Sequence, residues 1–192
     1  MGLFDGLTQQ LSGQVLSSIA SQLGADEGVT QTAIQTALPL LFSALSKNAS
    51  TEGGATSLSN AIDKDHDGSI LESLMDFIPN ATPGSGAGIL SHLLGNKTDL
   101  ATQGISQSSG LSSGQVGQLL ITLAPIILGY LGKQKQQSGL DASGLADLLG
   151  GEREVAQNSA PGGLGMLANL LDMNHDGSPV DDVLGMLGRF MK

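Results

Sequence analysis

Two long apolar runs, one in each half of the chain, most constrain how this sequence can fold. Residues 29–45 and 116–131 are apolar on nearly every side at helical spacing. A helix that is apolar all round must be packed on several sides, so each run predicts a central helix of a hydrophobic core. Each run also has a proline near its middle, Pro39 and Pro125, where the helix loses a backbone hydrogen bond or kinks. The paired prolines favour a packing feature over a functional hinge.

The two runs belong to an internal repeat in which corresponding residues lie 86 positions apart. Residues 36–47 align without gaps on residues 122–133. The same spacing relates three further pairs: Ile19 with Ile105, Gly24 with Gly110, and Gly28 with Gly114. A repeat of this kind predicts two structurally similar halves. We expect the first repeat to span 1–80 and the second 89–192, joined by the Gly- and Pro-rich segment 81–88 as a linker.

The rest of the sequence is also helical in pattern. Aromatic residues make up only 3% of the chain and Leu is the dominant apolar residue, which favours helices over β-sandwiches. Ser112 and Gln115 are spaced as a capping box before the second run, and Asp26 stands at the matching N-cap position before the first. Shorter helices are predicted at 4–23, 58–62, 70–78, 89–94, 100–106, 145–149, 164–171 and 180–191. No alternating strand pattern is present, so the predicted fold class is all-α.

Each half also carries one acidic loop that contains a glycine. The first loop, 63–69, reads Asp-Lys-Asp-His-Asp-Gly-Ser, and the second, 172–178, reads Asp-Met-Asn-His-Asp-Gly-Ser. Oxygen-bearing side chains at alternate positions, closed by a glycine at the sixth, form the front half of a calcium loop of the EF-hand type. Gly68 and Gly177 permit the sharp turn that such a loop needs. We therefore predict a calcium site in each loop, followed by a helix.

The candidate ligands are the oxygen-bearing residues of each loop and of the turn after it. They are Asp63, Asp65, Asp67, Ser69 and Glu72 in the first loop, and Asp172, Asn174, Asp176, Ser178, Asp181 and Asp182 in the second. Both loops depart from the EF-hand pattern at position 12, where Leu74 and Val183 replace the bidentate Glu. An early exit helix would turn Glu72 or Asp181 toward the ion. Alternatively, these acids only complement the dipole at a helix N-terminus.

Calcium is favoured over magnesium because the loops offer many flexible oxygens rather than a rigid octahedron. His66 and His175 stand at position 4, which points outward, so we expect them to be solvated rather than to bind a transition metal. The alternative is a pair of Asx-turns that cap helices with no ion bound. Against it, several carboxylates crowded together repel one another unless a cation lies between them. Without the bidentate Glu, we expect dissociation constants of roughly 10⁻⁴ to 10⁻³ M.

The chain is acidic, and its acids are clustered. It has 18 Asp and Glu against eight Lys and Arg, a formal net charge of −10, which argues against nucleic acid as a partner. Nine of the acids fall in the two loop segments: Asp63, Asp65, Asp67, Glu72, Asp76, Asp172, Asp176, Asp181 and Asp182. Half of the negative charge therefore lies where bound cations would neutralise it.

No enzyme site, disulfide or membrane span is predicted. The absence of cysteine excludes disulfides, zinc–thiolate sites and thiol catalysis. Three histidines, two of them inside the acidic loops, leave few candidates for acid–base chemistry, and no phosphate-binding or dinucleotide motif is present. The most apolar stretch, 119–131, is too short to span a bilayer and contains Pro125. No basic segment followed by an apolar run opens the chain, so no signal peptide is predicted and we expect a soluble protein.

Several segments together resemble a known family. Ile-Leu-Ser-His-Leu-Leu-Gly (89–95), Ser-Gly-Leu (109–111) and Leu-Ala-Pro-Ile-Ile-Leu-Gly (123–129) resemble the YidB-like bacterial family of unknown function, domain of unknown function 937. Members of that family carry a Leu-Ala-Pro helix followed by an Asp-x-Asn-x-Asp-Gly-Ser-x-x-Asp-Asp loop. Residues 172–182 match that loop closely, and residues 63–73 match it less well, with Glu-Ser in place of Asp-Asp. The resemblance implies an all-helical fold and brings no activity with it.

The sequence thus favours a non-enzymatic, calcium-binding helical protein with a structural or self-assembly role. We expect it to form a homo-oligomer or polymer, with residues 183–192 either making subunit contacts or closing the core of the protomer. The alternative is a cytoplasmic binding module that holds a partner helix or a small apolar ligand between its halves. A location outside the cell or at its surface, reached by an unconventional route, is slightly favoured over the cytoplasm.

Overall fold

The computed structural model describes residues 2–81 and 83–159. Within this part of the chain the structure consists of α-helices and short 3-10 turns, with no strand, which confirms the all-α prediction. The elements are α1 (Leu3–Gln10), α2 (Gln14–Leu23), α3 (Glu27–Ala49), α4 (Gly54–Asp65), η1 (Ser69–Glu72), α5 (Leu74–Phe77), η2 (Ile78–Asn80), α6 (Pro83–Leu94), η3 (Gly95–Lys97), α7 (Thr98–Ser109), α8 (Ser113–Ser138) and α9 (Ala142–Ser159). The helices predicted at 164–171 and 180–191 lie outside the described residues.

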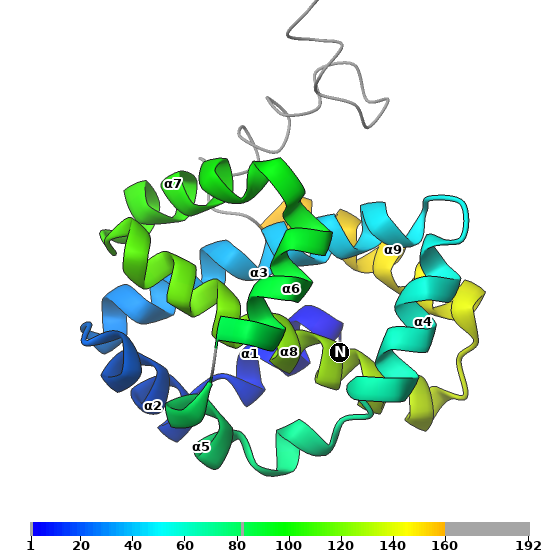
Figure 1. Ribbon diagram of the computed structural model, residues 1–192, viewed down its shortest axis with the longest axis horizontal. Coiled ribbons are helices and arrows are strands. Elements are labelled where there is room, and N and C mark those ends of the chain that lie inside the picture. Colours follow the sequence, from blue (N-terminus) through cyan, green and yellow to red (C-terminus); the bar gives the residue numbers. More distant parts are fainter. Residues whose placement is uncertain (1, 82, 160–192) are drawn as a thin grey trace, which may run out of the picture.

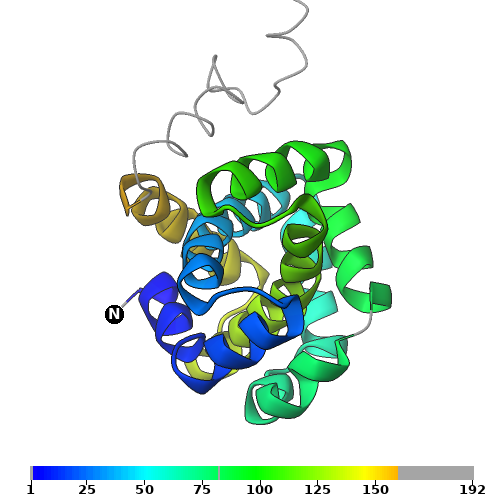
Figure 2. The same ribbon diagram turned by 90° about the vertical axis from the view of Figure 1, so that its left-hand side faces the viewer.

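Helices α3 and α8 form the centre of the fold, as the two apolar runs predict (Figure 1). Every residue of α8 from Thr122 to Gly132 is buried. Helix α3 contacts α1, α2, α4, α6, α7, α8 and α9, and α8 contacts α2, α4, α6, α7 and η1. Because each central helix is apolar all round, the other helices must cover it on several sides. The result is one core cluster that draws residues from both halves of the chain (Figure 2).

The starts of the two central helices are determined by their capping residues. The Asp26 carboxylate accepts hydrogen bonds from the backbone N–H groups of Gly28 and Val29, and α3 begins directly after it. At the start of α8, the Ser112 hydroxyl accepts from the Gln115 N–H while the Gln115 side chain accepts from the Ser112 N–H. Such reciprocal bonds satisfy donors that a helix start leaves unpaired. Both predicted caps are confirmed.

Pro39 and Pro125 are buried within α3 and α8, and each helix runs on past its proline. A proline has no N–H, so each of these helices lacks one internal hydrogen bond at its centre. The residues around both prolines are largely buried, and packing there compensates for the missing bond. This position in the core fits the packing interpretation of the prolines.

The prediction of a single helix over 4–23 is wrong, because the chain turns between α1 and α2. Gly13 has a φ of +62° there, a left-handed conformation that L side chains avoid and glycine adopts freely. Leu11, at the end of α1, is buried in the core. The helical spacing of apolar residues therefore continues through the turn. For this reason periodicity alone does not indicate that one helix ends and another begins here.

The composition of segment 81–88 predicts a linker, but α6 begins inside this segment, at Pro83. Proline suits the first position of a helix, where its missing N–H has no helical partner in any case. Gly86 lies against α8 so closely that a Cβ atom at this position would overlap the backbone carbonyl of Ile121. At least one glycine in this segment therefore serves close helix packing. Composition alone does not distinguish that role from a flexible linker.

Helix α8 is long and apolar enough to cross a membrane, judged by length and composition, and is alone in this among the described residues. Of its most apolar window, 67% is buried inside the fold. The central helix of a folded core meets the same criteria, so this observation is weak evidence for a membrane span.

We expect Gly86→Ala to lower the free energy of unfolding by about 1–3 kcal/mol, because the added methyl must push α6 away from α8. Gly88→Ala is the matched control, since Gly88 lies in the same helix with nothing within 4 Å of an added Cβ. Alanine there should stabilise the protein by about 0.5–1 kcal/mol through helix propensity. Chemical denaturation of both variants measures the difference. Equal effects of the two substitutions would contradict the close packing of α6 on α8.

Candidate functional site

The first acidic loop connects the end of α4 to the turn η1. Asp63 and Asp65 lie in the last turn of α4, and only residues 66–68 are outside a helix or 3-10 turn. Gly68 has a φ of +100°, which confirms the predicted sharp turn at this glycine. The loop is therefore shorter than an EF-hand loop, because the helix continues through its first three positions.

The loop backbone lies directly on α8. A Cβ atom at Gly132 would overlap the carbonyl oxygen of His66, and one at Gly129 would overlap the side chain of Ile70. The Gln136 side chain donates a hydrogen bond of 2.9 Å to the Asp67 carbonyl. Glycines on α8 thus leave the space that the loop fills.

Lys135 of α8 forms an ion pair with the first candidate ligand. Its Nζ lies 2.5 Å from each carboxylate oxygen of Asp63. The lysine side chain is 11% exposed, whereas that of Asp63 is 58% exposed. The lysine therefore reaches the carboxylate along the protein surface with most of its own length covered.

The carboxylate of Asp67 is engaged by the turn itself. Its Oδ1 accepts a 3.0 Å hydrogen bond from the backbone N–H of Ser69, two residues ahead. Mainly through this N–H, and also through the Ser69 hydroxyl, the pKa of Asp67 is lowered from its usual value. This is the Asx-turn arrangement that the sequence leaves open as the alternative to ion binding.

His66 caps the end of α4 and is partly buried, which differs from the expectation of a solvated side chain. Its burial lowers its pKa below the ordinary value of 6.5, against a smaller opposing effect of the negative charge on Asp65. The loop lies close on α8, so the position that points to solvent in an EF-hand faces protein here.

The described residues do not bring the first set of ligands together. No group of three or more His, Cys, Asp or Glu side chains is arranged to hold a metal ion within 2–81 and 83–159. Asp65 and Glu72 are exposed, and no hydrogen bond joins either to the rest of the loop among the interactions described. The second set, Asp172, Asn174, Asp176, Ser178, Asp181 and Asp182, lies outside the described residues.

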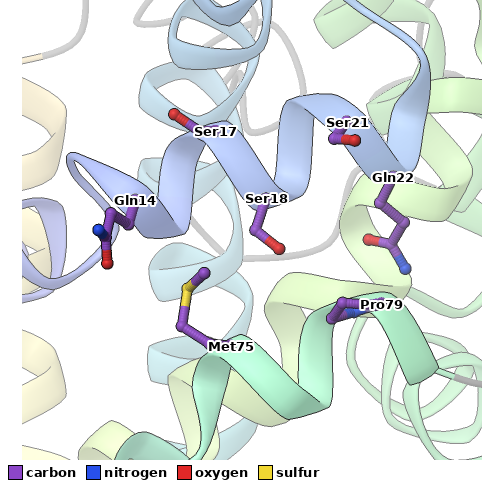
Figure 3. Close-up of a pocket in the computed structure, with 7 residues that line it drawn as sticks. All are labelled: Gln14, Ser17, Ser18, Ser21, Gln22, Met75 and Pro79. Carbon is purple, nitrogen blue, oxygen red and sulfur yellow. The ribbon is translucent and has the colours of Figure 1, made fainter.

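A surface cleft of about 690 Å³ lies elsewhere, between α2 and the α5–η2 segment. It is lined by Gln14, Ser17, Ser18, Ser21 and Gln22 of α2, and by Met75 and Pro79 opposite them (Figure 3). Its volume falls within the range of small-molecule sites, but hydroxyl and amide groups form one whole side of it. No acidic or basic side chain takes part in this lining.

Comparison with known proteins identifies the family. Residues 5–134 match the model of a family described as bacterial proteins of unknown function (DUF937). The chain belongs to this family. The matched stretch includes the first acidic loop and ends before the second. No curated protein and no solved structure matches the chain.

Lys135 and Gln136 are the residues of this site that the sequence analysis missed. They come after the apolar run of α8, where a polar tail is the usual end of a helix and carries no signal of its own. The spacing of Gly129 and Gly132 just before them is the available clue. Two glycines one helical turn apart on a buried helix indicate a place where another backbone comes close.

We expect His66→Gln to reduce the loss of stability when the pH falls from about 7.5 to about 5.5. The folded-state pKa of His66 is lowered, so the unfolded chain takes up the proton first. The stability that this histidine contributes is complete above the unfolded-state pKa of about 6.5 and is lost as the pH falls from there through the lower folded-state pKa. Urea denaturation of both proteins at the two pH values measures this. An identical pH dependence in the variant would contradict the burial of His66.

Proposed function

We propose that the protein is a non-enzymatic, calcium-binding helical protein with a structural or self-assembly role. The proposal combines three elements. They are a duplicated helical scaffold, calcium binding by an acidic loop, and self-association of the protein in the conformation that bound calcium stabilises. Each element has its own support. The calcium element is the one on which the mechanism depends.

The duplication is supported by the helix boundaries, which recur at the 86-residue spacing of the sequence repeat. The N-caps Asp26 and Ser112 stand at this spacing, before α3 and α8. The glycines that end α2 and α7, Gly24 and Gly110, are also related by it, and both are left-handed. Gly53 and Gly139 also share this spacing and a positive φ, +71° and +60°, but Gly53 precedes α4 whereas Gly139 follows α8. Coincidences of this kind are not expected of unrelated segments, so an ancestral α-helical unit that was copied explains them best.

The observation that carries the calcium proposal is the charge of the second loop. Residues 172–182 contain four acids and no Lys or Arg. Four carboxylates within so short a segment repel one another unless a cation joins them. Their alternation with Asn174 and Ser178 before and after a glycine is the oxygen pattern that calcium prefers. This loop has the better match to a calcium site, and the first loop has Asp63 already paired with Lys135.

The affinity that this ligand set supports is low. With Val183 in place of the bidentate Glu, dissociation constants of roughly 10⁻⁴ to 10⁻³ M are expected, as in extracellular calcium modules. Such a site would be filled where calcium is millimolar and would serve as a structural brace rather than as a cytosolic sensor. This favours a role outside the cytoplasm.

The self-assembly element is supported by apolar side chains available for contact. Met75 and Leu100 are 48% and 53% exposed on the described surface. Residues 183–192 add a further Leu-, Met- and Phe-rich segment at the end of the chain. Apolar side chains that remain exposed in a protomer can be covered by a partner copy, and we propose this role for Met75 and Leu100.

The alternative function, a module that binds a partner helix or a small apolar ligand, has one observation in its favour. The cleft between α2 and the α5–η2 segment is large enough for a small molecule. Its lining is mostly hydroxyl and amide groups, and both of its sides come from the first half of the chain. It therefore fits a polar ligand better than the apolar one that this alternative requires.

We expect the wild-type chain to bind calcium in the millimolar range and to grow in size on binding. Asp172→Ala combined with Asp176→Ala should abolish both effects, because the loop loses two of its ligands. Glu52→Ala combined with Asp147→Ala is the control, since both acids are exposed, lie outside the loops and change the net charge equally. Titration calorimetry measures binding, and light scattering measures size.

Two results would contradict the proposal in different ways. If the wild type releases no heat with millimolar calcium, the calcium element is wrong. If calcium binds but the particle size stays the same, the ion has a role within one protomer, and the self-assembly element is wrong.

A further inference from the structure

We propose that the ammonium group of Lys135 takes the place of a divalent cation at the first acidic loop. The loop then docks on α8 without a metal. This inference concerns only residues that the structure describes, and it makes Lys135 a positioning residue for the segment 63–72.

The need for a cation here arises from the end of α4. Asp63 and Asp65 lie in the last turn of this helix. The backbone carbonyls at a helix C-terminus carry partial negative charge, so carboxylates are disfavoured there and cations are favoured. Lys64 in the same turn offsets one of these charges, and Asp67 adds a third acid directly after the helix. A positive charge at this place relieves the repulsion both among the acids and between the acids and the helix dipole.

Lys135 supplies that charge in the geometry of an ion bound by a carboxylate. Its Nζ lies at the same distance, 2.5 Å, from both oxygens of Asp63. A carboxylate chelates a cation in this bidentate manner, as the EF-hand Glu does with calcium. Because its side chain is 11% exposed, the lysine is held against the protein rather than free to move through solvent.

The neighbours of Lys135 complete the docking without any ion. Gln136 holds the Asp67 carbonyl by a hydrogen bond of 2.9 Å. Gly132 provides the space for the His66 carbonyl, where any side chain would collide. Asp67 uses its carboxylate on the Ser69 N–H. The Asp67 carboxylate, which an EF-hand-type site would use as the ligand at position 5, thus already accepts a hydrogen bond from a protein donor.

Hydrogen exchange of residues 63–72 tests the role of Lys135 directly. The N–H groups of His66, Ser69 and Leu71 are all hydrogen-bonded within this region and report on its opening. In Lys135→Met, which keeps a long apolar side chain, exchange should become about three- to fivefold faster, the range expected for loss of a partly exposed ion pair. Lys135→Arg should restore the wild-type rate.

Lys133→Met is the matched control. Lys133 lies on the same helix with its Cβ near Gly68, but its side chain is exposed and no ion pair to an acid is described for it. The same loss of charge there should leave exchange of the loop unchanged. Asp63→Asn provides a second route if Lys135→Met does not fold. It should also speed exchange, but less than Lys135→Met, because it removes a repelling carboxylate together with the ion pair. The double variant should be no faster than Lys135→Met alone, since both changes remove one interaction.

The calcium arm separates this inference from the proposed function. Exchange of 63–72 in the wild type should be the same in EDTA and in millimolar calcium. If calcium slows it severalfold, a divalent cation holds the loop and the inference is overturned. It is also overturned if Lys135→Met exchanges like the wild type. If calorimetry detects no calcium binding to the wild-type protein, the proposed function is contradicted. The conclusion about Lys135 would not be affected.

Discussion

The burial of the central parts of α3 and α8 is the constraint on which the rest of this structure depends. A helix with one apolar stripe needs one neighbour, but a helix that is apolar all round needs a ring of them. Because these two helices are in contact, the remaining helices of the described chain must pack around the pair to cover its apolar surface. The helices α1, α2, α4, α6, α7 and α9 cover these two, and the first acidic loop packs on α8 as well.

Close covering of a helix requires small residues where backbones meet, and this explains the distribution of several glycines. Gly86 on α6 meets the backbone of α8, and Gly129 and Gly132 on α8 meet the segment after α4. The chain has 28 glycines, and by composition they suggest loops and linkers. At these three positions they instead allow helices and a loop to approach without a side chain between them.

The sequence predicts those parts of the fold that local signals determine. The central helices are predicted by periodicity, their starts by Asp26 and Ser112, and the turn after α4 by Gly68. The sequence does not predict the break at Gly13, because the apolar pattern continues across it. Nor does it predict the start of α6 at Pro83, because the Gly- and Pro-rich composition there resembles that of a linker. The sequence alone does not distinguish a glycine that adopts a positive φ from a glycine that allows two backbones to pack closely.

For the candidate site, the same division holds. The residue types and spacing predict the acidic loop, and the turn at its glycine is confirmed. The partner of Asp63 could not be predicted, since Lys135 lies 72 residues away and reaches it only after α8 has packed. Nor does the motif reveal that α4 continues to Asp65, because nothing in Asp-Lys-Asp stops a helix. In this structure Asp63 and Asp65 therefore have helical backbone conformation, which the motif alone does not indicate.

If calcium acts at the second loop as proposed, the two acidic loops would depend on different cations. The ammonium group of Lys135 is present at every calcium concentration, so the first loop would dock on α8 unconditionally. Residues 172–182, with four acids and no Lys or Arg, would instead depend on a free cation. Calcium would then act on the second loop and leave the docking of the first unchanged. Under the proposed function, that arrangement would suit a subunit that folds in one environment and assembles in another.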